Sequence, residues 1–133
     1  YTIQQPYLFA TKTSSVFNYF KDLSTYDTIK NLTYEGLIMF LLDDGWLNYD
    51  KRIENKYGKG HFCISRGTLT QEDLELLCQK YNGYGMNAHI ISRGDISFYQ
   101  RDNELIYQYA TSFIPKDIDI MQKKFKNMQI VNI

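Results

Sequence analysis

Two adjacent carboxylates, Asp43 and Asp44, follow directly on the longest apolar run of the sequence and precede Gly45. A carboxylate beside apolar sequence needs hydrogen bonds, an ion pair or a hard divalent cation to compensate for its lost hydration. Mg²⁺ suits such a site because it prefers oxygen ligands and keeps several waters. The alternative is that both residues only solvate the end of a helix, although anions there oppose the helix dipole. Local conflicts of this kind are typical of functional sites, so both side chains are candidate metal ligands.

A second group of candidate residues is polar and mostly basic, and it falls on segments that alternate like β-strands. Basic residues outnumber acidic ones over 46–66 and 86–101, whereas 71–80 is acidic. A twisted β-ribbon can enter the DNA major groove, where such side chains contact phosphates and base edges. The alternative is the solvent-exposed face of an ordinary antiparallel sheet. The candidate nucleic-acid-binding residues are Lys51, Arg52, Lys56, Lys59, His61, Ser65, Arg66, Asn87, His89, Arg93, Ser97, Tyr99 and Arg101.

Length and charge limit the classes of protein that could carry these groups. The 133 residues suffice for one ordinary domain, and 44% hydrophobic residues provide material for a core. The 15 Lys and Arg balance the 15 Asp and Glu, which argues against a uniformly basic nucleic-acid binder. A neutral total still permits a basic sheet face backed by an acidic helix layer.

Other motifs and segments exclude further classes. The sequence has no phosphate-binding loop, dinucleotide fingerprint, nucleophile elbow or zinc-binding helix motif. Its longest apolar stretch, 36–42, is too short for a membrane span, and no signal peptide is expected. Cys63 and Cys78 lack the spacing of a disulfide framework or a zinc site, so both are expected to be reduced core residues.

The pattern along the chain predicts an α+β fold. A cap at Thr33 followed by an apolar run predicts a buried helix, and from there the order is helix, strand, strand, helix, strand, strand, helix. Period-two alternation turns the apolar residues of the later strands towards the helices. The expected elements are a strand over 7–12, a helix over 16–23, a loop over 24–31, a helix over 34–42, strands over 46–49 and 60–66, a helix from 71 to about 81, strands over 86–93 and 96–101, and a helix over 103–113.

An internal echo indicates how the chain is organised. A shift of 89 positions places Phe9 on Phe98 and Lys12 on Arg101, so residues 7–23 echo residues 96–113. The sequence therefore predicts three parts. They are 1–31, which resembles the end of a preceding repeat, 32–115, which is one complete αββαββα unit, and 116–133, a basic C-terminal tail.

The segment 37–45, LIMFLLDDG, resembles the signature helix of the LAGLIDADG homing endonucleases, in particular the subgroup whose second motif ends in DDG. Leu32-Thr33, the run 69–77 and Met121 with Lys124 are similar to further recurring elements of that family. The resemblance covers roughly residues 5–125. It implies a LAGLIDADG-type αββαββα unit with a saddle-like antiparallel sheet and helices on one face.

The resemblance also implies a function. It implies a site-specific, Mg²⁺-dependent endonuclease that reads the major groove of double-stranded DNA with its sheet. Two signature helices would pack side by side, each delivering one acid. Asp44 would be the catalytic metal ligand, the Gly45 carbonyl would lie near the same metal, and Lys124 would be a catalytic basic residue close to the scissile phosphate. With one signature motif present, a second LAGLIDADG half must come from a missing N-terminal repeat or another chain.

Two other functions stay open. One is a non-cleaving LAGLIDADG derivative that binds nucleic acid, as an intron maturase, a ribosome-associated RNA binder or a transcription factor, so RNA is a possible partner. Ile38 and Met39, which are larger than the small residues usual in the family helix, are compatible with it. The other is an unrelated α+β interaction domain. The 12 Tyr, with many Ile, Asn and Lys, indicate an AT-rich gene. This predicts an intracellular protein, either organellar (mitochondrial) or from phage or bacterial cytoplasm, with no membrane partner.

Overall fold

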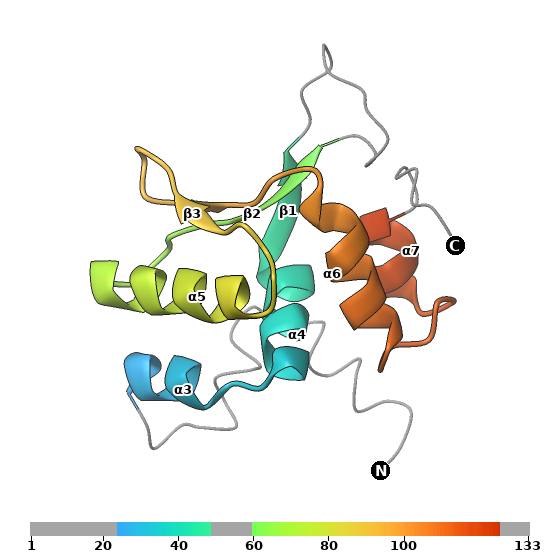
Figure 1. The fold of residues 1–133 in the computed structure, drawn as a ribbon, viewed down its shortest axis with the longest axis horizontal. Helices are drawn as coiled ribbons and strands as arrows, with labels where there is room; N and C mark the ends of the chain where they lie inside the picture. The colour runs from blue at the N-terminus through green and yellow to red at the C-terminus, as the bar shows by residue number, and fades with distance from the viewer. Residues whose placement is uncertain (1–23, 49–59, 126–133) are drawn as a thin grey trace.

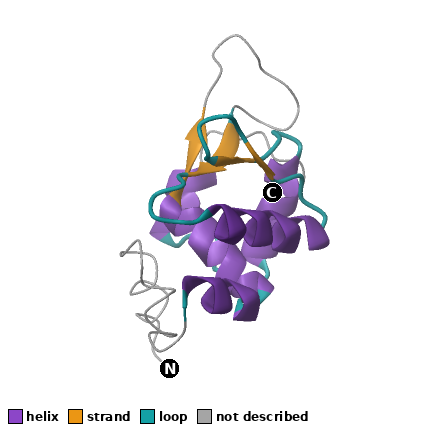
Figure 2. Ribbon diagram, turned by 90° about the vertical axis from the view of Figure 1, so that its left-hand side faces the viewer, coloured by secondary structure: helices purple, strands orange, loops and turns teal. Residues whose placement is uncertain are grey.

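A computed structural model describes residues 24–48 and 60–125 of the chain. These residues form five helices and a four-stranded antiparallel sheet, which is the α+β class expected from the sequence. The strands lie along one side of the molecule and the helices beneath them (Figures 1 and 2). The elements are α3 (Thr25–Asn31), α4 (Tyr34–Asp44), β1 (Gly45–Asn48), β2 (His61–Ile64), α5 (Gln71–Gly83), β3 (His89–Ile90), β4 (Ile96–Ser97), α6 (Asp102–Thr111) and α7 (Asp119–Phe125).

The apolar run forms the central helix, α4, as predicted. Thr33 caps it, because the Thr33 side chain accepts a hydrogen bond from the backbone N–H of Gly36. All six side chains from Leu37 to Leu42 are buried, and a helix that is apolar on every side belongs in the centre of a core. Figure 1 shows α4 between α3 and α5 on one side and α6 and α7 on the other. Because β1 begins at Gly45, directly after Asp44, the C-terminus of α4 meets the sheet.

The strand order is β1-β2-β4-β3, and every pair is antiparallel. Directly paired residues share a face of the sheet, so the register defines two rows. The row that faces the helices consists of Gly45, Ile64, Ile96 and Ile90. Ile64 and Ile96 are fully buried in the core, which confirms the predicted direction of these side chains.

The second row lies on the sheet surface turned away from the helices, which we call the open face. It consists of Trp46, Cys63, Ser97 and His89. Both cysteines are free, as expected. Cys63, however, is buried on the open face and not within the core cluster, while Cys78 is only half-buried.

Residues 24–31, expected to be a loop, form a helix instead. Ser24 caps α3 by accepting a hydrogen bond from the backbone N–H of Asp27, and only Thr28 and Ile29 are buried. The segment looks like a loop because a short helix with two buried residues has almost no apolar periodicity. The expected strand at 7–12 and helix at 16–23 lie outside the described residues, and α7 forms within the segment expected to be a basic tail.

The strands β3 and β4 are shorter than the predicted 86–93 and 96–101 because side chains replace part of the backbone ladder. The Asn82 amide exchanges two hydrogen bonds with the backbone of Ala88. The Asp102 carboxylate accepts hydrogen bonds from the backbone N–H groups of Asn87 and Tyr99. The backbone groups of these residues are therefore hydrogen-bonded to side chains, although the residues do not pair as strands.

Lys80 joins α5 to the C-terminal end of α3. Its ammonium group donates hydrogen bonds to the carbonyl oxygens of Ile29, Lys30 and Leu32 at 2.9, 2.8 and 2.6 Å. Burial lowers the Lys80 pKa. The last carbonyl groups of a helix have no partners within it and carry the negative end of its dipole, so an ammonium group satisfies both requirements.

Replacing Lys80 should therefore destabilise the fold. We expect Lys80→Met, which keeps the aliphatic stem, to lower the free energy of unfolding by about 2 kcal/mol in urea titrations followed by circular dichroism. Lys123→Met is the control, because Lys123 forms only an exposed pair with Asp119 and should change stability by less than about 0.5 kcal/mol. Equal effects of the two substitutions would show that the contacts with α3 contribute nothing.

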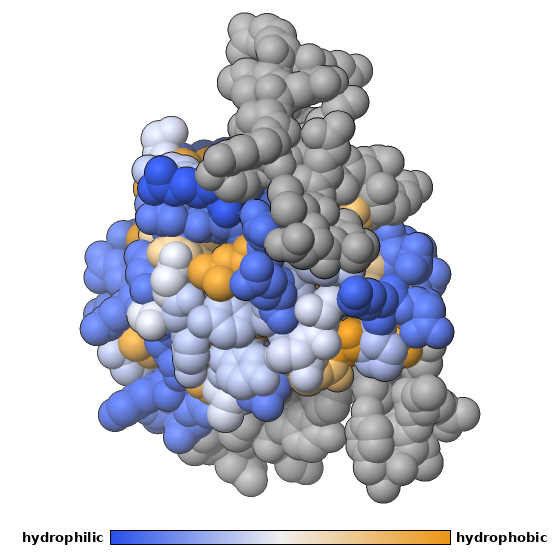
Figure 3. All heavy atoms as spheres, turned by 45° about the vertical axis from the view of Figure 1, so that its right-hand side comes forward, coloured by the Kyte–Doolittle hydropathy of each residue, from blue (hydrophilic) through white to orange (hydrophobic). Residues whose placement is uncertain are grey.

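No helix in the described ranges is long and apolar enough to cross a membrane. Outside the atoms drawn in grey, the surface in Figure 3 is mostly hydrophilic and carries only small, separate hydrophobic patches.

Candidate active site and nucleic-acid interface

The two acidic residues at the end of α4 have carboxylate oxygens without partners. The Oδ2 atom of Asp43 and the Oδ1 atom of Asp44 are both shielded from solvent, and neither accepts a hydrogen bond from the residues that the structure describes. An unpaired buried carboxylate oxygen is strongly unfavourable. The site is therefore electrostatically incomplete as it stands, and a cation would complete it.

Gly45 allows the abrupt passage from α4 into β1. Its N–H donates to the Leu41 carbonyl oxygen, and its backbone is extended, with φ −80°. A Cβ atom at this position would collide with the Leu41 carbonyl oxygen and lie 3.0 Å from the Cys63 carbonyl oxygen. Glycine is required here for space and not for conformational freedom, because both neighbours are backbone atoms that cannot rotate away.

Lys124 of α7 reaches the same point from the other end of the chain. Its Nζ atom donates a hydrogen bond of 2.7 Å to the Gly45 carbonyl oxygen. Within the described residues it forms no ion pair with Asp43 or Asp44. The resemblance placed a metal near this carbonyl, and the structure places an ammonium group there.

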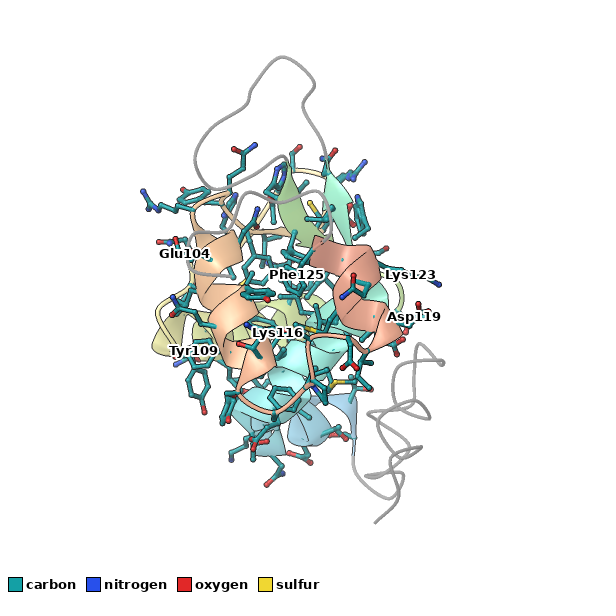
Figure 4. All side chains as sticks on the ribbon, turned by 90° about the vertical axis from the view of Figure 1, so that its right-hand side faces the viewer. Glu104, Tyr109, Lys116, Asp119, Lys123 and Phe125 are labelled. Carbon is teal, nitrogen blue, oxygen red and sulfur yellow. The ribbon has the colours of Figure 1, made fainter. Side chains whose placement is uncertain are left out.

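The packing of α7 explains why two neighbouring lysines differ. Phe125 lies between α6 and α7, and its ring contacts Phe62 and Tyr107 with centroid separations of 5.8 and 5.0 Å (Figure 4). Lys123 lies on the outer side of α7 beside Asp119. The buried aromatic ring fixes the rotation of the helix, so Lys124, and not Lys123, lies at the acidic end of α4.

Burial dominates the electrostatics of this cluster. It raises the pKa of Asp43 to about 6, against the opposing effect of Lys124. The pKa of Asp44 rises to about 7, because burial and the neighbouring charge of Asp43 both disfavour ionisation and exceed the effect of Lys124. Burial also lowers the pKa of Lys124, against the opposing effect of the two acids. Without a further cation, the cluster binds protons near neutral pH.

This predicts an unusual pH dependence of stability. Between about pH 4 and pH 7 the unfolded chain has released protons that the folded carboxyl groups retain, so their contribution to the free energy of unfolding falls as the pH rises. In EDTA, we expect the free energy of unfolding of Asp44→Asn to rise relative to that of the wild type by about 1 to 3 kcal/mol across this pH range. This value allows for partial solvent screening of the carboxylate. Millimolar Mg²⁺ should reduce the difference at pH 7.5. A difference that does not change with pH would contradict the raised pKa values.

The residues at the end of α4 fit a divalent cation of the kind that the resemblance implies. Asp43, Asp44 and the Gly45 carbonyl supply only oxygen donors, and two carboxylate oxygens lack partners. Mg²⁺ is typically held by one or two carboxylates and several waters. The described residues contain no cluster of three or more His, Cys, Asp or Glu that could enclose a metal alone. The donor set is therefore that of an open, partly completed site.

Apart from Ser97, the predicted nucleic-acid-binding residues fall into three groups. Ser65, Arg66, Arg93, Tyr99 and Arg101 are exposed, and His61, Asn87 and His89 are half-buried. Burial and the nearby His89 lower the pKa of His61. Lys51, Arg52, Lys56 and Lys59 lie outside the described residues.

Ser97 lies on the predicted face of the sheet, away from the helices, but it is buried there, with 5% of its surface exposed. It belongs to the open-face row, next to Cys63 and between the larger residues Trp46 and His89. Two small side chains in the middle of such a row are covered by their larger neighbours. Ser97 is therefore not available for contacts with a nucleic acid in this structure.

Arg93 and Arg66 are held by groups of the protein. The Arg93 side chain forms an ion pair with Asp95 and lies 6.0 Å from the centroid of the Trp46 ring. The other Asp95 oxygen accepts a hydrogen bond from the Arg66 backbone N–H, and the Arg66 Nε donates to the Leu69 carbonyl oxygen. Both side chains remain exposed, but the Arg93 charge is already matched by a carboxylate.

The pattern made Asp43 a candidate metal ligand beside Asp44, but the resemblance assigned the metal to Asp44, although Asp43 has an unpaired oxygen of its own. Sequence reasoning missed two further residues that organise these regions. Trp46 supports Arg93, and the buried Asp102 holds both Asn87 and Tyr99. The available signal for Asp102 was an acidic residue at the start of a helix, which does not reveal its partners.

Comparison with known proteins identifies the fold. The structure matches one of the homing endonuclease I-WcaI bound to its DNA recognition sequence, with a TM-score of 0.53 and 21% sequence identity. The match covers 84% of this chain and 46% of that one. The fold is that of one half of a LAGLIDADG homing endonuclease. No family model and no curated protein sequence matches the chain.

Proposed function

We propose that this chain is one half of a Mg²⁺-dependent, site-specific endonuclease that cuts double-stranded DNA. The observation that carries the proposal is the pair of unpartnered, shielded oxygens on Asp43 and Asp44, located where the central helix meets the sheet. Hydrolysing a phosphodiester requires a cation that polarises the phosphate and activates water, and these oxygens could hold one.

In this proposal, each residue of the site has its own role. Asp44 holds the metal, with Asp43 and the Gly45 carbonyl beside it. Lys124, which already contacts that carbonyl at 2.7 Å, provides a fixed positive charge next to the site of a scissile phosphate. Exposed Arg66, Arg93 and Arg101 on and around the open face contact DNA. Binding then depends on salt, because cations on the protein replace counterions of the phosphates.

A complete site needs a second half. The match spans less than half of the comparison protein, which binds DNA, so the chain corresponds to one of two such units. One α4 supplies only two carboxylates, and within the described residues no third Asp, Glu, His or Cys joins them in a group that could hold a metal ion. We propose that a second LAGLIDADG unit, in the same polypeptide or another chain, supplies the remaining acid.

A non-cleaving nucleic-acid binder on the same scaffold is the second candidate. The observation that favours it is the Lys124 ammonium group at the Gly45 carbonyl, beside both acids. A fixed internal cation next to two carboxylates can stabilise them in place of a metal. In that case the open face would bind DNA or RNA without catalysis.

The deciding experiment is cleavage of a randomised double-stranded DNA library by the longest natural form of the protein that contains this chain. Reactions with Mg²⁺ and with EDTA are compared by sequencing the ends produced. Cuts at a common sequence that require Mg²⁺ would establish the endonuclease. Retained salt-dependent binding to DNA or RNA without cuts would favour the second candidate, and loss of both would overturn any nucleic-acid function.

A further inference from the structure

Arg101 differs from Arg66 and Arg93 because, within the described residues, no protein group accepts a hydrogen bond from its guanidinium group. Arg93 pairs with Asp95, and the Arg66 Nε donates to the Leu69 carbonyl oxygen. Arg101 is exposed, and its guanidinium carbon lies 4.9 Å from the centroid of the Tyr99 ring. Its five N–H donors are therefore not used by the described part of the chain and can contact a ligand.

Two aromatic rings in contact, those of Tyr99 and His89, support Arg101. The Tyr99 ring is 47% exposed, and its centroid lies 5.0 Å from that of the His89 ring at an interplanar angle of 49°. The His89 ring nitrogen Nδ1 lies 3.1 Å from the Asn87 carbonyl oxygen, which fixes the ring in turn. A guanidinium group over an aromatic ring keeps its planar fork in one orientation at little further entropic cost.

The buried Asp102 carboxylate fixes the backbone next to both of these rings. Asp102 is 3% exposed and accepts hydrogen bonds from the Asn87 N–H at 3.0 Å, the Asn87 side-chain amide at 2.8 Å and the Tyr99 N–H at 3.1 Å. It therefore ties the segment before β3 to the segment after β4. The positions of His89, Tyr99 and Arg101 are set before any ligand binds.

From this arrangement we infer that Arg101, oriented by Tyr99 and His89, is a specificity-determining residue that reads one guanine in the major groove. The inference rests on the proposed binding of double-stranded DNA. A planar fork of free donors matches the two acceptors of guanine, N7 and O6, which no other base presents together. Arg93 has the same side chain, but its pair with Asp95 already occupies part of that fork. We assign to Arg93 a phosphate contact or a supporting role.

The test is a binding selection from randomised double-stranded DNA with the longest natural form of the protein, in EDTA, which withholds the divalent cation that the proposed cleavage requires. The wild type is expected to select sites with guanine at one defined position. Arg101→Ala should reduce the guanine preference at that position about tenfold or more and leave the remaining positions of the site unchanged. Arg101→Lys keeps the charge but not the fork, so it should keep most of the affinity and lose most of the preference.

Further variants separate base reading from charge and from folding. Tyr99→Leu should reduce the same preference less than Arg101→Ala does, because the fork remains but its support is lost. Lys116→Ala removes one exposed positive charge away from the sheet, so its selected site should equal that of the wild type. Thermal unfolding should show that all variants fold.

The outcomes distinguish this inference from the proposed function. If Arg101→Ala lowers affinity equally for all sequences, Arg101 contacts phosphate and the guanine assignment is overturned. If a guanine preference persists in Arg101→Ala and disappears in Arg93→Ala, the two arginines have the opposite roles. If the wild type binds no double-stranded DNA at any salt concentration, the proposed function fails and the inference fails with it.

Discussion

Asp44→Asn is expected to abolish DNA cleavage, with a loss of at least about a thousandfold in rate, while DNA affinity changes less than about threefold. The substitution keeps the size of the side chain but removes the charge that would hold a divalent cation. It should not destabilise the metal-free protein, because a shielded carboxylate without a partner is replaced by a neutral group. Single-turnover cleavage and equilibrium binding of the selected site measure the two effects.

Asp43→Asn and Asp119→Asn are the matched controls. Asp43 has an unpaired oxygen of its own, so its substitution should reduce cleavage less severely than that of Asp44. Asp119 is an exposed residue paired with Lys123, and its substitution should leave cleavage unchanged. Loss of binding together with cleavage in Asp44→Asn would show a structural role. Full activity of Asp44→Asn would remove the metal site from the proposal.

Gly45→Ala should cause a large loss of stability. The new Cβ would meet the carbonyl oxygens of Leu41 and Cys63, so relief requires movement of the junction between α4 and β1. We expect the free energy of unfolding to fall by about 3 kcal/mol or more in urea titrations. Cleavage should also fall, because the same movement displaces Asp44 and the carbonyl that Lys124 contacts.

Gly83→Ala provides the contrast, since it adds the same methyl group at the end of α5. A Cβ there would have no atom within 4 Å, and the position has no positive φ. Alanine should raise the free energy of unfolding by about 0.5 kcal/mol, because it reduces the freedom of the unfolded chain. A loss at Gly45 as small as the change at Gly83 would show that the junction adapts easily.

Features that depend on local sequence were predictable, and α4 is the clearest case. Its cap at Thr33 and its continuous apolar residues act within one segment, so the sequence alone indicates the helix. The helix α3 was missed because it has only two buried residues and because the contacts of its last carbonyl groups with Lys80 join residues about 50 positions apart. The lengths of β3 and β4 failed for a similar reason, since Asp102 and Asn82 compete for their backbone groups.

The candidate site was predictable only in part. Adjacent acids after an apolar run pointed to Asp44, and alternation indicated which side chains leave the core. Neither pattern shows which side chains interact, so the sequence did not distinguish Arg93, which pairs with Asp95, from Arg101, which lies over the Tyr99 ring. Ser97 is buried because of the size of its neighbours across the sheet. The strand register determines which residues those are, and the alternation of the sequence does not reveal the register.

The contact between Lys124 and Gly45 bears on the order in which the molecule assembles. The two residues are 79 positions apart, and contacts of such range are costly to close and are typically made late in folding. During synthesis the carboxylates of α4 emerge well before the helix that carries the ammonium group. Until α7 packs against α4, the two acids therefore lack the Lys124 ammonium group. A chain interrupted between α6 and α7 would keep both acids and lack Lys124, the half-buried cation that contacts the carbonyl next to them.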